Sequence, residues 1–285
     1  MKIVDTHIHV WDFERAAYPW LKGDTSILNR TWKLEEIANE RIESGITSGV
    51  LVQAGCNLED TGLMLEIAHN NDWIDGVVGW LPLTHPEKTN QLLEEKYLKE
   101  KYFKGVRHLI HDEKDSEWLL QPSVIESLKL LAAKNIPYDM VGVLPAHLET
   151  TLKVIEKVPT LHIVLDHLNA PPIPEKVYFG RWGELMKEVA QNRNIYAKIS
   201  GLGTAGGSFE NRTPDDIKPY ITYALEIFGA DRCFCGGDWP VSMLANSYFT
   251  TWQITKKILN EILTAAQMEK VFFSNANSFY KLGLS

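Results

Sequence analysis

Two histidines near the start of the chain have a spacing that suits chemistry. His7 and His9 stand two apart in the stretch IVDTHIHVWD, with Asp5 two residues before His7 and Asp12 three residues after His9. Alternate side chains of a β-strand share a face, so a strand over 2–9 would bring Asp5, His7 and His9 together. Imidazoles placed in this way can donate hydrogen bonds, move protons or bind a metal ion. A lone H-x-H pattern is common, so its meaning depends on what other strand ends supply.

Ionisable residues also close several later apolar stretches. Four further stretches end in Arg107 and His108, in Asp166 and His167, in Lys198, and in Asp238, which precedes Trp239 and Pro240. Buried strands normally carry Val, Ile and Leu at these positions, so polar groups concentrated at one end need a reason. Taken jointly, they predict a catalytic site rather than a structural coincidence.

The elements that must position these residues follow a repeating pattern. The predicted strands are 2–9, 47–54, 75–83, 103–110, 137–143, 161–167, 195–201 and 232–238, and the predicted helices between them include 34–45, 122–135, 146–157 and 215–229. Asn135 and Gly229 fit positions beyond a helix C-terminus, and Thr213 before Pro214 is typical of a helix start. Strands that alternate with helices and are often apolar on both faces predict a parallel sheet closed into a (β/α)₈ barrel.

An open doubly wound sheet is the alternative fold, but no Gly-x-Gly-x-x-Gly or P-loop follows any predicted strand. Residues 10–34 form an aromatic-rich insertion after the first strand, and 168–182 are rich in proline. Both segments would lie on the carboxyl face of a barrel, where active sites form, and the insertion is a candidate lid. We expect residues 1–285 to form one domain, with the helical chain end packed under or against the barrel.

Composition narrows the class of partner. The 285 residues carry a net charge of −8, which argues against nucleic acid and anionic membranes. Neither a signal peptide pattern nor an apolar stretch long enough to span a membrane is present, so we expect a cytoplasmic protein. Cys56, Cys233 and Cys235 show no disulfide pattern, and we expect core packing for the closely spaced pair.

Six segments, in order, carry a family resemblance: THIHVWD, VGWLPL, FKGVRHLIHDE, VLDHLNAPP, AKISGL and GGDWPV. They resemble the amidohydrolase superfamily, whose fold is a distorted (β/α)₈ barrel. Within it they resemble the sugar-lactone hydrolase branch, which includes L-fuconolactonase-like and L-rhamnono-lactonase-like enzymes and is related to the pyrone-dicarboxylate lactonases. The resemblance runs from Lys2 to about Tyr280.

The resemblance implies roles for six residues. These are His7 and His9 as the strand-one pair, His167 as the strand-six histidine, Asp238 as the strand-eight aspartate that takes a proton from water, and Arg107 with His108 as substrate contacts. Many amidohydrolases bind zinc through the strand-one pair, a strand-five histidine and the strand-eight aspartate. Two-metal members add a carboxylated lysine or a glutamate on strand four.

The sequence departs from that metal pattern. Strand five, PYDMVGV, contains no histidine, and His147 lies four residues beyond it. On strand four, Lys104 comes too early to reach the rim and Arg107 is not a metal ligand. Other lactonases of this branch that lack the strand-five ligand work without an obligatory metal, so we expect no required cofactor. If one divalent ion such as zinc bound, its ligands would be His7, His9 and Asp238.

Hydrolysis of a lactone needs a base for water, hydrogen-bond donors for the oxyanion and a proton for the leaving alkoxide. We expect Asp238 to be the base and the later proton donor, with His7, His9 and His167 as N–H donors toward the carbonyl oxygen. The predicted substrate contacts are Arg107, His108, Gln53 and Lys198 for hydrogen bonds, and Trp11, Trp20, Trp80 and Trp239 for apolar faces. Lys198 lies near the oxyanion or near Asp238, or is an exposed lysine at a strand edge.

The sequence therefore predicts a barrel hydrolase that opens the lactone of a sugar acid. A metal-dependent member of the same superfamily, a hydrolase or decarboxylase of another small carboxylated substrate, is the enzymatic alternative. The alternative without enzymatic activity is a sugar-binding barrel. Asp238 argues against this alternative, because a binder of neutral sugars does not need a carboxylate facing histidines. The oligomeric state is left open, a homodimer being one alternative. We expect His69, His85, His111 and His162 to be surface or core residues.

Overall fold

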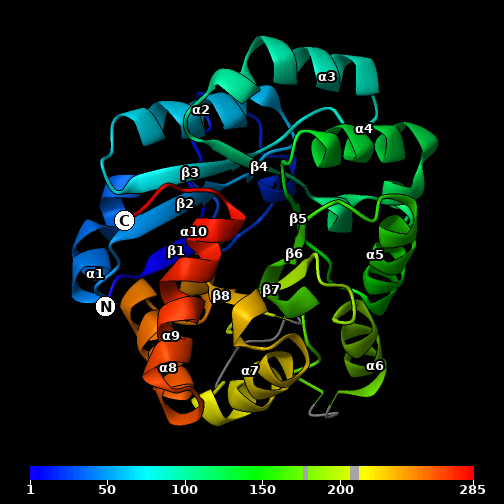
Figure 1. Cartoon of the computed structure of the whole chain (residues 1–285). Helices are drawn as coiled ribbons and strands as arrows, with labels where there is room; N and C mark the ends of the chain where they lie inside the picture. The colour runs from blue at the N-terminus through cyan, green and yellow to red at the C-terminus, as the bar shows by residue number, and fades with distance from the viewer. Residues whose placement is uncertain (176–178, 206–211) are drawn as a thin grey trace.

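Eight parallel strands form one sheet in the computed structural model, which describes residues 1–175, 179–205 and 212–285. The strands are β1 (Val4–Ile8), β2 (Ser48–Val52), β3 (Ile74–Gly79), β4 (Phe103–His108), β5 (Tyr138–Met140), β6 (Ile163–Leu165), β7 (Ile195–Ile199) and β8 (Cys233–Cys235). Neighbours in the sheet follow chain order, and the strands are surrounded by helices (Figure 1). This arrangement confirms the predicted (β/α)₈ barrel, and β3 begins one residue earlier than predicted.

The ring of helices includes all four that the sequence predicted. The helices are α1 (Ala38–Glu43), α2 (Leu58–His69), α3 (Pro86–Glu95), α4 (Pro122–Ala133), α5 (Pro145–Lys157), α6 (Gly180–Val189), α7 (Pro214–Phe228), α8 (Tyr248–Ile262), α9 (Ala265–Glu269) and α10 (Asn275–Phe279). The predicted helix 34–45 is a 3₁₀ turn over Leu34–Ile37 followed by α1. Asn135 and Gly229 have φ of 60° and 74°, as expected just beyond helices α4 and α7.

The barrel closes where the first strand meets the chain after the last one. The backbone N–H of Asp238 donates to the carbonyl of His7 at 2.7 Å, and that of His9 donates to the carbonyl of Trp239 at 2.7 Å. Ile8 and Trp239 form an isolated parallel bridge. The same hydrogen bonds that close the sheet therefore place the H-x-H segment beside Asp238.

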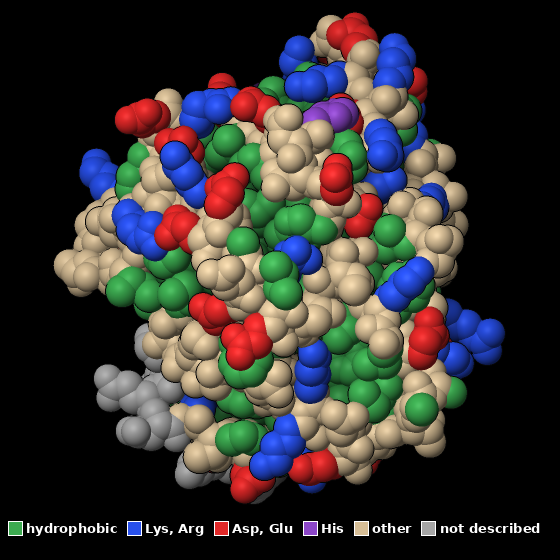
Figure 2. Space-filling view, turned by 90° about the vertical axis from the view of Figure 1, so that its left-hand side faces the viewer, with side chains coloured by type: hydrophobic (Ala, Val, Ile, Leu, Met, Phe, Trp, Pro, Cys, Tyr) green, Lys and Arg blue, Asp and Glu red, His purple; other side chains and the backbone are tan. Residues whose placement is uncertain are grey.

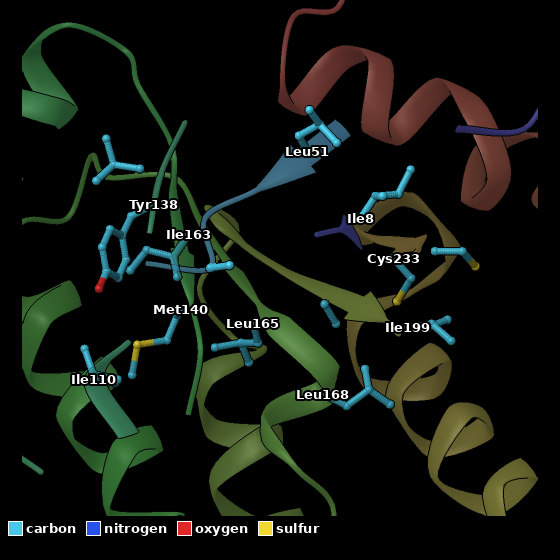
Figure 3. Packing of buried hydrophobic residues seen from close by; sticks show 14 of the residues in the cluster. Ile8, Leu51, Ile110, Tyr138, Met140, Ile163, Leu165, Leu168, Ile199 and Cys233 are labelled. Atoms are coloured by element: carbon cyan, nitrogen blue, oxygen red, sulfur yellow. The ribbon is translucent and has the colours of Figure 1, made fainter. Parts of the chain in front are cut away.

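Apolar side chains of adjacent strands pack against the surrounding helices (Figure 3). Cys233 and Cys235 are both fully buried and unpaired, and Cys233 lies near Ile199 in this layer (Figure 3). This placement agrees with the expected core packing of the cysteine pair. Among the described residues, no helix is long and apolar enough to cross a membrane.

The end of the chain packs against the barrel strands, as predicted. Helix α10 crosses in front of the strands in the view of Figure 1. Phe279 and Tyr280 pack in one buried cluster with Val4, Val50 and Phe234, which come from three different strands. Tyr280 also donates from its hydroxyl to the Asp139 carboxylate of β5 at 2.7 Å, so the chain end reaches the polar centre of the barrel.

The insertion after β1 is folded onto the barrel rim. Trp11 and Trp32 exchange two backbone hydrogen bonds, at 3.2 and 2.9 Å. Tyr18 donates to the buried Asp60 carboxylate at the start of α2. Within the proline-rich stretch 168–182, residues 176–178 lie outside the described part. On the face seen in Figure 2, acidic and basic side chains are interspersed.

Candidate active site

Three side chains from the two joined strand ends converge at the carboxyl end of the barrel. The Nε2 atoms of His7 and His9 are 3.1 Å apart. Oδ1 of Asp238 lies 3.5 Å from Nε2 of His9 and 3.8 Å from Nε2 of His7. All three residues are buried, so their mutual interactions are little screened by water.

His167 joins this group through an unusual piece of backbone after β6. Four consecutive residues, His167 to Ala170, have positive φ between 47° and 54°. This left-handed turn is costly for residues other than glycine, and such strain concentrates at functional sites. The turn brings Nε2 of His167 to 3.9 Å from Oδ1 of Asp238, and its Nδ1 is 2.9 Å from the Ser200 hydroxyl.

Gly201 is required where the chain just beyond β7 passes this turn. Its φ is +59°, and a Cβ there would lie 2.5 Å from Nδ1 of His167 and 2.7 Å from Oδ2 of Asp238. Both distances are shorter than side chains tolerate. The absence of a side chain at Gly201 therefore lets the backbone after β7 approach His167 and Asp238 closely.

A second polar layer lies beneath the histidines. The Lys198 ammonium donates to Asp139 at 2.6 Å and forms an ion pair with Asp166 at 2.8 Å. It also lies 3.2 Å from Nδ1 of His7. Arg107 donates from Nε to Asp166 at 2.9 Å, so two cations and two carboxylates neutralise one another in the barrel centre.

Burial and charge set the protonation states of this layer. Burial lowers the pKa of His7 well below its usual value, against the attraction of Asp166. Burial also lowers the pKa of His167. For Asp166, burial acts to raise the pKa, but Lys198 and His7 outweigh it and hold that pKa well below its usual value. At neutral pH the two histidines are therefore neutral and Asp166 is charged.

Hydrogen bonding fixes one ring proton of His9. Nδ1 of His9 lies 2.8 Å from the carbonyl oxygen of Val52, which can only accept, so Nδ1 carries a proton. With that proton alone, the ring presents a lone pair at Nε2. The expected role of His9 as an N–H donor toward a substrate carbonyl needs a second ring proton, on Nε2, and stays a prediction.

Above these residues lies a cavity of about 570 Å³. Its wall combines ionisable groups with small and apolar side chains: His9, Trp20, Ala54, Arg107, Leu109, His111, Val141, Gly142, Val143, His167, Ala170, Glu175, Gly201, Thr204, Ala205, Asp238 and Val241. Pockets of this size and composition bind small organic molecules. Arg107 keeps one nitrogen for a ligand, because Nε and Nη1 donate to Asp166 and Gln53 while Nη2 has no partner among the described residues.

The structure brings together part of the predicted site. Of the described residues predicted to act, the cavity wall contains Asp238, His9, His167, Arg107 and Trp20, whereas it does not contain His7, Gln53, His108, Lys198, Trp11, Trp80 or Trp239. His7 and Lys198 lie deeper, and Lys198 is fully buried, which excludes the exposed lysine at a strand edge.

The other residues away from the wall have structural partners. His108 accepts from Trp80 Nε1 at 2.9 Å, donates to Glu113 at 2.8 Å and stacks on Trp118. The side-chain amide of Gln53 donates to the sulfur of Cys56. Trp11 donates to a backbone carbonyl within the insertion, and Trp239 packs edge-on against Trp32; both are about 1% exposed.

Two ionisable residues of the wall were not predicted as site residues. His111 was expected to be a surface or core residue, but it borders the cavity just after β4. Its position three residues beyond the RH pair was a usable signal, because chain following a barrel strand lies on the active face. Glu175 comes from the proline-rich stretch after β6, where no periodicity indicates which side chains turn inward.

The three converging ligand atoms match the needs of a metal ion in spacing. His7, His9 and Asp238 offer atoms that all lie within 4.8 Å of one another. A tetrahedral zinc ion with bonds of about 2.0–2.1 Å holds its ligand atoms roughly 3.3 Å apart. The observed separations of 3.1, 3.5 and 3.8 Å bracket that value, so the three residues fit a single divalent ion.

This chain is similar to known proteins along the entire barrel. A sequence model of the amidohydrolase family matches residues 4–282. An L-fucono-1,5-lactonase of Burkholderia ambifaria is 28% identical over 287 residues, which cover 98% of this chain and 95% of that protein. An L-rhamnono-gamma-lactonase of Scheffersomyces stipitis is 25% identical over 199 residues, covering 63% and 59% of the two chains.

Among solved structures, an amidohydrolase from Burkholderia multivorans with bound zinc superposes with a TM-score of 0.90. It is 26% identical, and the match covers 99% of each chain. A second crystal form of that protein contains bound HEPES instead. The structural match therefore spans nearly the whole of both chains.

Proposed function

This chain belongs to the amidohydrolase family, and from that premise we propose that it hydrolyses the internal ester of a sugar-acid lactone. One observation carries the proposal. The Asp238 carboxylate lies among three histidines at the wall of a cavity of about 570 Å³. The names of relatives, L-fucono-1,5-lactonase and L-rhamnono-gamma-lactonase, support a lactone of this class as substrate.

Asp238 is the base in this proposal. A carboxylate can accept a proton from water as that water attacks the lactone carbonyl. Nε2 of His9 lies 3.5 Å from Oδ1 of Asp238 and 3.1 Å from Nε2 of His7, so the two rings hold the carboxylate in place while Asp238 accepts the proton of the water.

His167 and Arg107 supply the donors for the developing oxyanion. Both border the cavity, and Nη2 of Arg107 has no other partner among the described residues. The Ser200 hydroxyl can donate to Nδ1 of His167, which leaves the ring proton on Nε2 to point toward the site. Asp238 then returns its proton to the departing alkoxide, and the ring opens to the free hydroxy acid.

The proposed reaction has no obligatory metal. A lactone carbonyl is activated by its ring, so a carboxylate base and fixed donors meet its needs. If a divalent ion such as zinc binds, His7, His9 and Asp238 hold it, and the ion polarises the carbonyl as a Lewis acid.

The remaining cavity wall suits a ring that carries both hydroxyl groups and apolar edges. Glu175 and His111 can pair with hydroxyl groups, and Trp20 and Val141 offer apolar surface. The indole nitrogen of Trp20 donates to the carbonyl of Ala54, which holds the ring in place at the wall.

A panel of lactones tests the proposal. We would follow acid release with a pH indicator from the 1,4- and 1,5-lactones of fuconate, rhamnonate, galactonate and arabinonate. We expect at least one of them to be hydrolysed with saturation kinetics. If none is turned over while sugars still bind, the protein is a binding barrel and the proposal fails.

A metal-dependent hydrolase or decarboxylase of another small carboxylated substrate is the second candidate, and the ligand spacing favours it. Metal content of the purified protein and activity after chelation separate the two. We expect chelated protein to keep its lactonase activity. A large loss that zinc restores would select the metal-dependent alternative.

A further inference from the structure

We propose that Lys198 is a positioning residue that keeps the ring proton of His7 on Nε2, so that His7 is a hydrogen-bond donor in the site and resists binding a metal ion. The inference rests on the proposed function and deepens it, because it gives a structural reason for hydrolysis without an obligatory metal. It concerns a residue that does not border the cavity, and it can be tested without a substrate.

The first argument counts the hydrogens of the Lys198 ammonium. An ammonium group has three N–H donors and no lone pair. Nζ of Lys198 donates to Asp139 at 2.6 Å, forms an ion pair with Oδ1 of Asp166 at 2.8 Å and lies 3.2 Å from Nδ1 of His7. Two carboxylates beside Nζ favour an ammonium group, and an ammonium group can only donate to His7. Nδ1 must then accept, and a neutral His7 carries its single proton on Nε2.

The second argument comes from the other side of the His7 ring. Nε2 of His7 lies 3.1 Å from Nε2 of His9. Because Nδ1 of His9 donates to the carbonyl of Val52, its Nε2 is an acceptor. Donors and acceptors therefore run in one direction, from Lys198 through His7 and His9 to Val52. The hydrogen bonds at both ends of this chain select the same tautomer of His7.

Binding a metal ion requires the other tautomer. A metal at Nε2 needs the lone pair of that atom, which moves the ring proton to Nδ1. Metal-bound histidines usually donate this second N–H to a carboxylate. Asp166 is available for that purpose, with Oδ1 3.5 Å from Nδ1 of His7. Lys198 is closer, however, and a protonated Nδ1 would place two donors against each other. Lys198 thus decides between the two states of His7.

The first test reads the tautomer in the unmodified protein. In ¹⁵N-labelled, chelator-treated protein, nitrogen shifts and their couplings to ring protons show which nitrogen of a histidine carries the proton, and a His7→Gln variant assigns the signals. We expect His7 to be protonated on Nε2 and His9 on Nδ1. A proton on Nδ1 of His7 would overturn the inference. The test needs neither turnover nor a variant of Lys198.

The second test measures zinc affinity by competition with a chromophoric chelator. The Lys198→Met/Asp139→Asn variant removes one buried charge of each sign, and Arg107 continues to neutralise Asp166 at 2.9 Å. Without Lys198, Nδ1 of His7 can donate to Asp166. Second-layer partners typically change metal affinity by about 10–100-fold, so we expect zinc to bind at least about tenfold more tightly.

The single variant Asp139→Asn is the matched control. It keeps Lys198 between His7 and Asp166, so we expect zinc affinity close to that of the wild type. Equal affinity in the double variant and the control would overturn the inference. A failure to hydrolyse any lactone would remove the proposed function but leave the tautomer and the affinity measurements unchanged, so the two failures are distinguishable.

Discussion

Replacement of Arg107 by methionine separates the two tasks that the structure gives this side chain. Inside the barrel, its Nε donates to Asp166 and its Nη1 donates to the carbonyl of Gln53. Toward the cavity, Nη2 is available for the substrate. Methionine has a similar length and fills much of the space, so the change removes the charge and the donors with little loss of packing.

The structure gives a magnitude for each task. Breaking a buried ion pair by removing one partner costs about 3–5 kcal/mol. Asp166 keeps Lys198 at 2.8 Å, so we expect the lower end, about 3 kcal/mol, and a fall in Tm of about 5 °C. Loss of one oxyanion donor lowers kcat roughly 10²–10³-fold.

Calorimetry gives the first number, and initial rates of acid release from the best lactone give the second. Arg107→Lys is the control, because it keeps a charge beside Asp166 but cannot span three partners as the guanidinium does. We expect the lysine variant to recover most of the Tm and little of the kcat. If Arg107→Met kept kcat within about threefold of wild type and raised only KM, Arg107 would bind substrate without stabilising the oxyanion, and our assignment would be refuted.

Three further predictions follow from the same geometry. Gly201→Ala should lower kcat by about 10²-fold, because a Cβ there would displace His167 and Asp238. Gly229→Ala is the control: Gly229 also has a positive φ but has open space around it, so kcat should be unchanged in the same rate assay. His167→Asn should lower kcat roughly 10²–10³-fold with a Tm near that of wild type, because asparagine tolerates the φ of 54° at this position. A rate near wild type would exclude His167 as a donor. Burial raises the pKa of Asp60 from 3.8 to about 6, so its proton is held more tightly in the folded state and stability is lost as pH rises through that window. Urea unfolding should therefore show the stability advantage of wild type over Asp60→Asn shrinking by about 2 kcal/mol between pH 4 and pH 7, and a difference independent of pH would contradict this.

The sequence was sufficient for the barrel and for the centre of the candidate site. Strand periodicity placed His7 and His9 on one face of the predicted strand 2–9, and the repeat of strands and helices placed Asp238 at the neighbouring strand end. These features are local or follow from regular parallel pairing. The hydrogen bonds that close the barrel then bring the two segments together without further information.

The sequence was not sufficient for the walls of the cavity or the state of its protons. The irregular turns that bring His111 and Glu175 to the cavity have no periodicity to read. The ring proton on Nδ1 of His9 could not be foreseen either, because its partner is the backbone carbonyl of Val52, a residue 43 positions away. The burial of Lys198 could not be predicted either. The two carboxylates that make burial of its charge possible come from β5 and from the end of β6, which are distant in the sequence.

Asp238→Asn tests the central claim of base catalysis most directly. Asparagine tolerates the φ of 56° at this position, and the backbone hydrogen bonds of residue 238 to His7 and Ser242 do not involve the side chain. The measurement is kcat for the best lactone with chelated protein, together with Tm. We predict a loss of kcat of roughly 10²–10⁴-fold with the fold retained. Turnover close to that of wild type in a correctly folded Asp238→Asn protein would contradict the account.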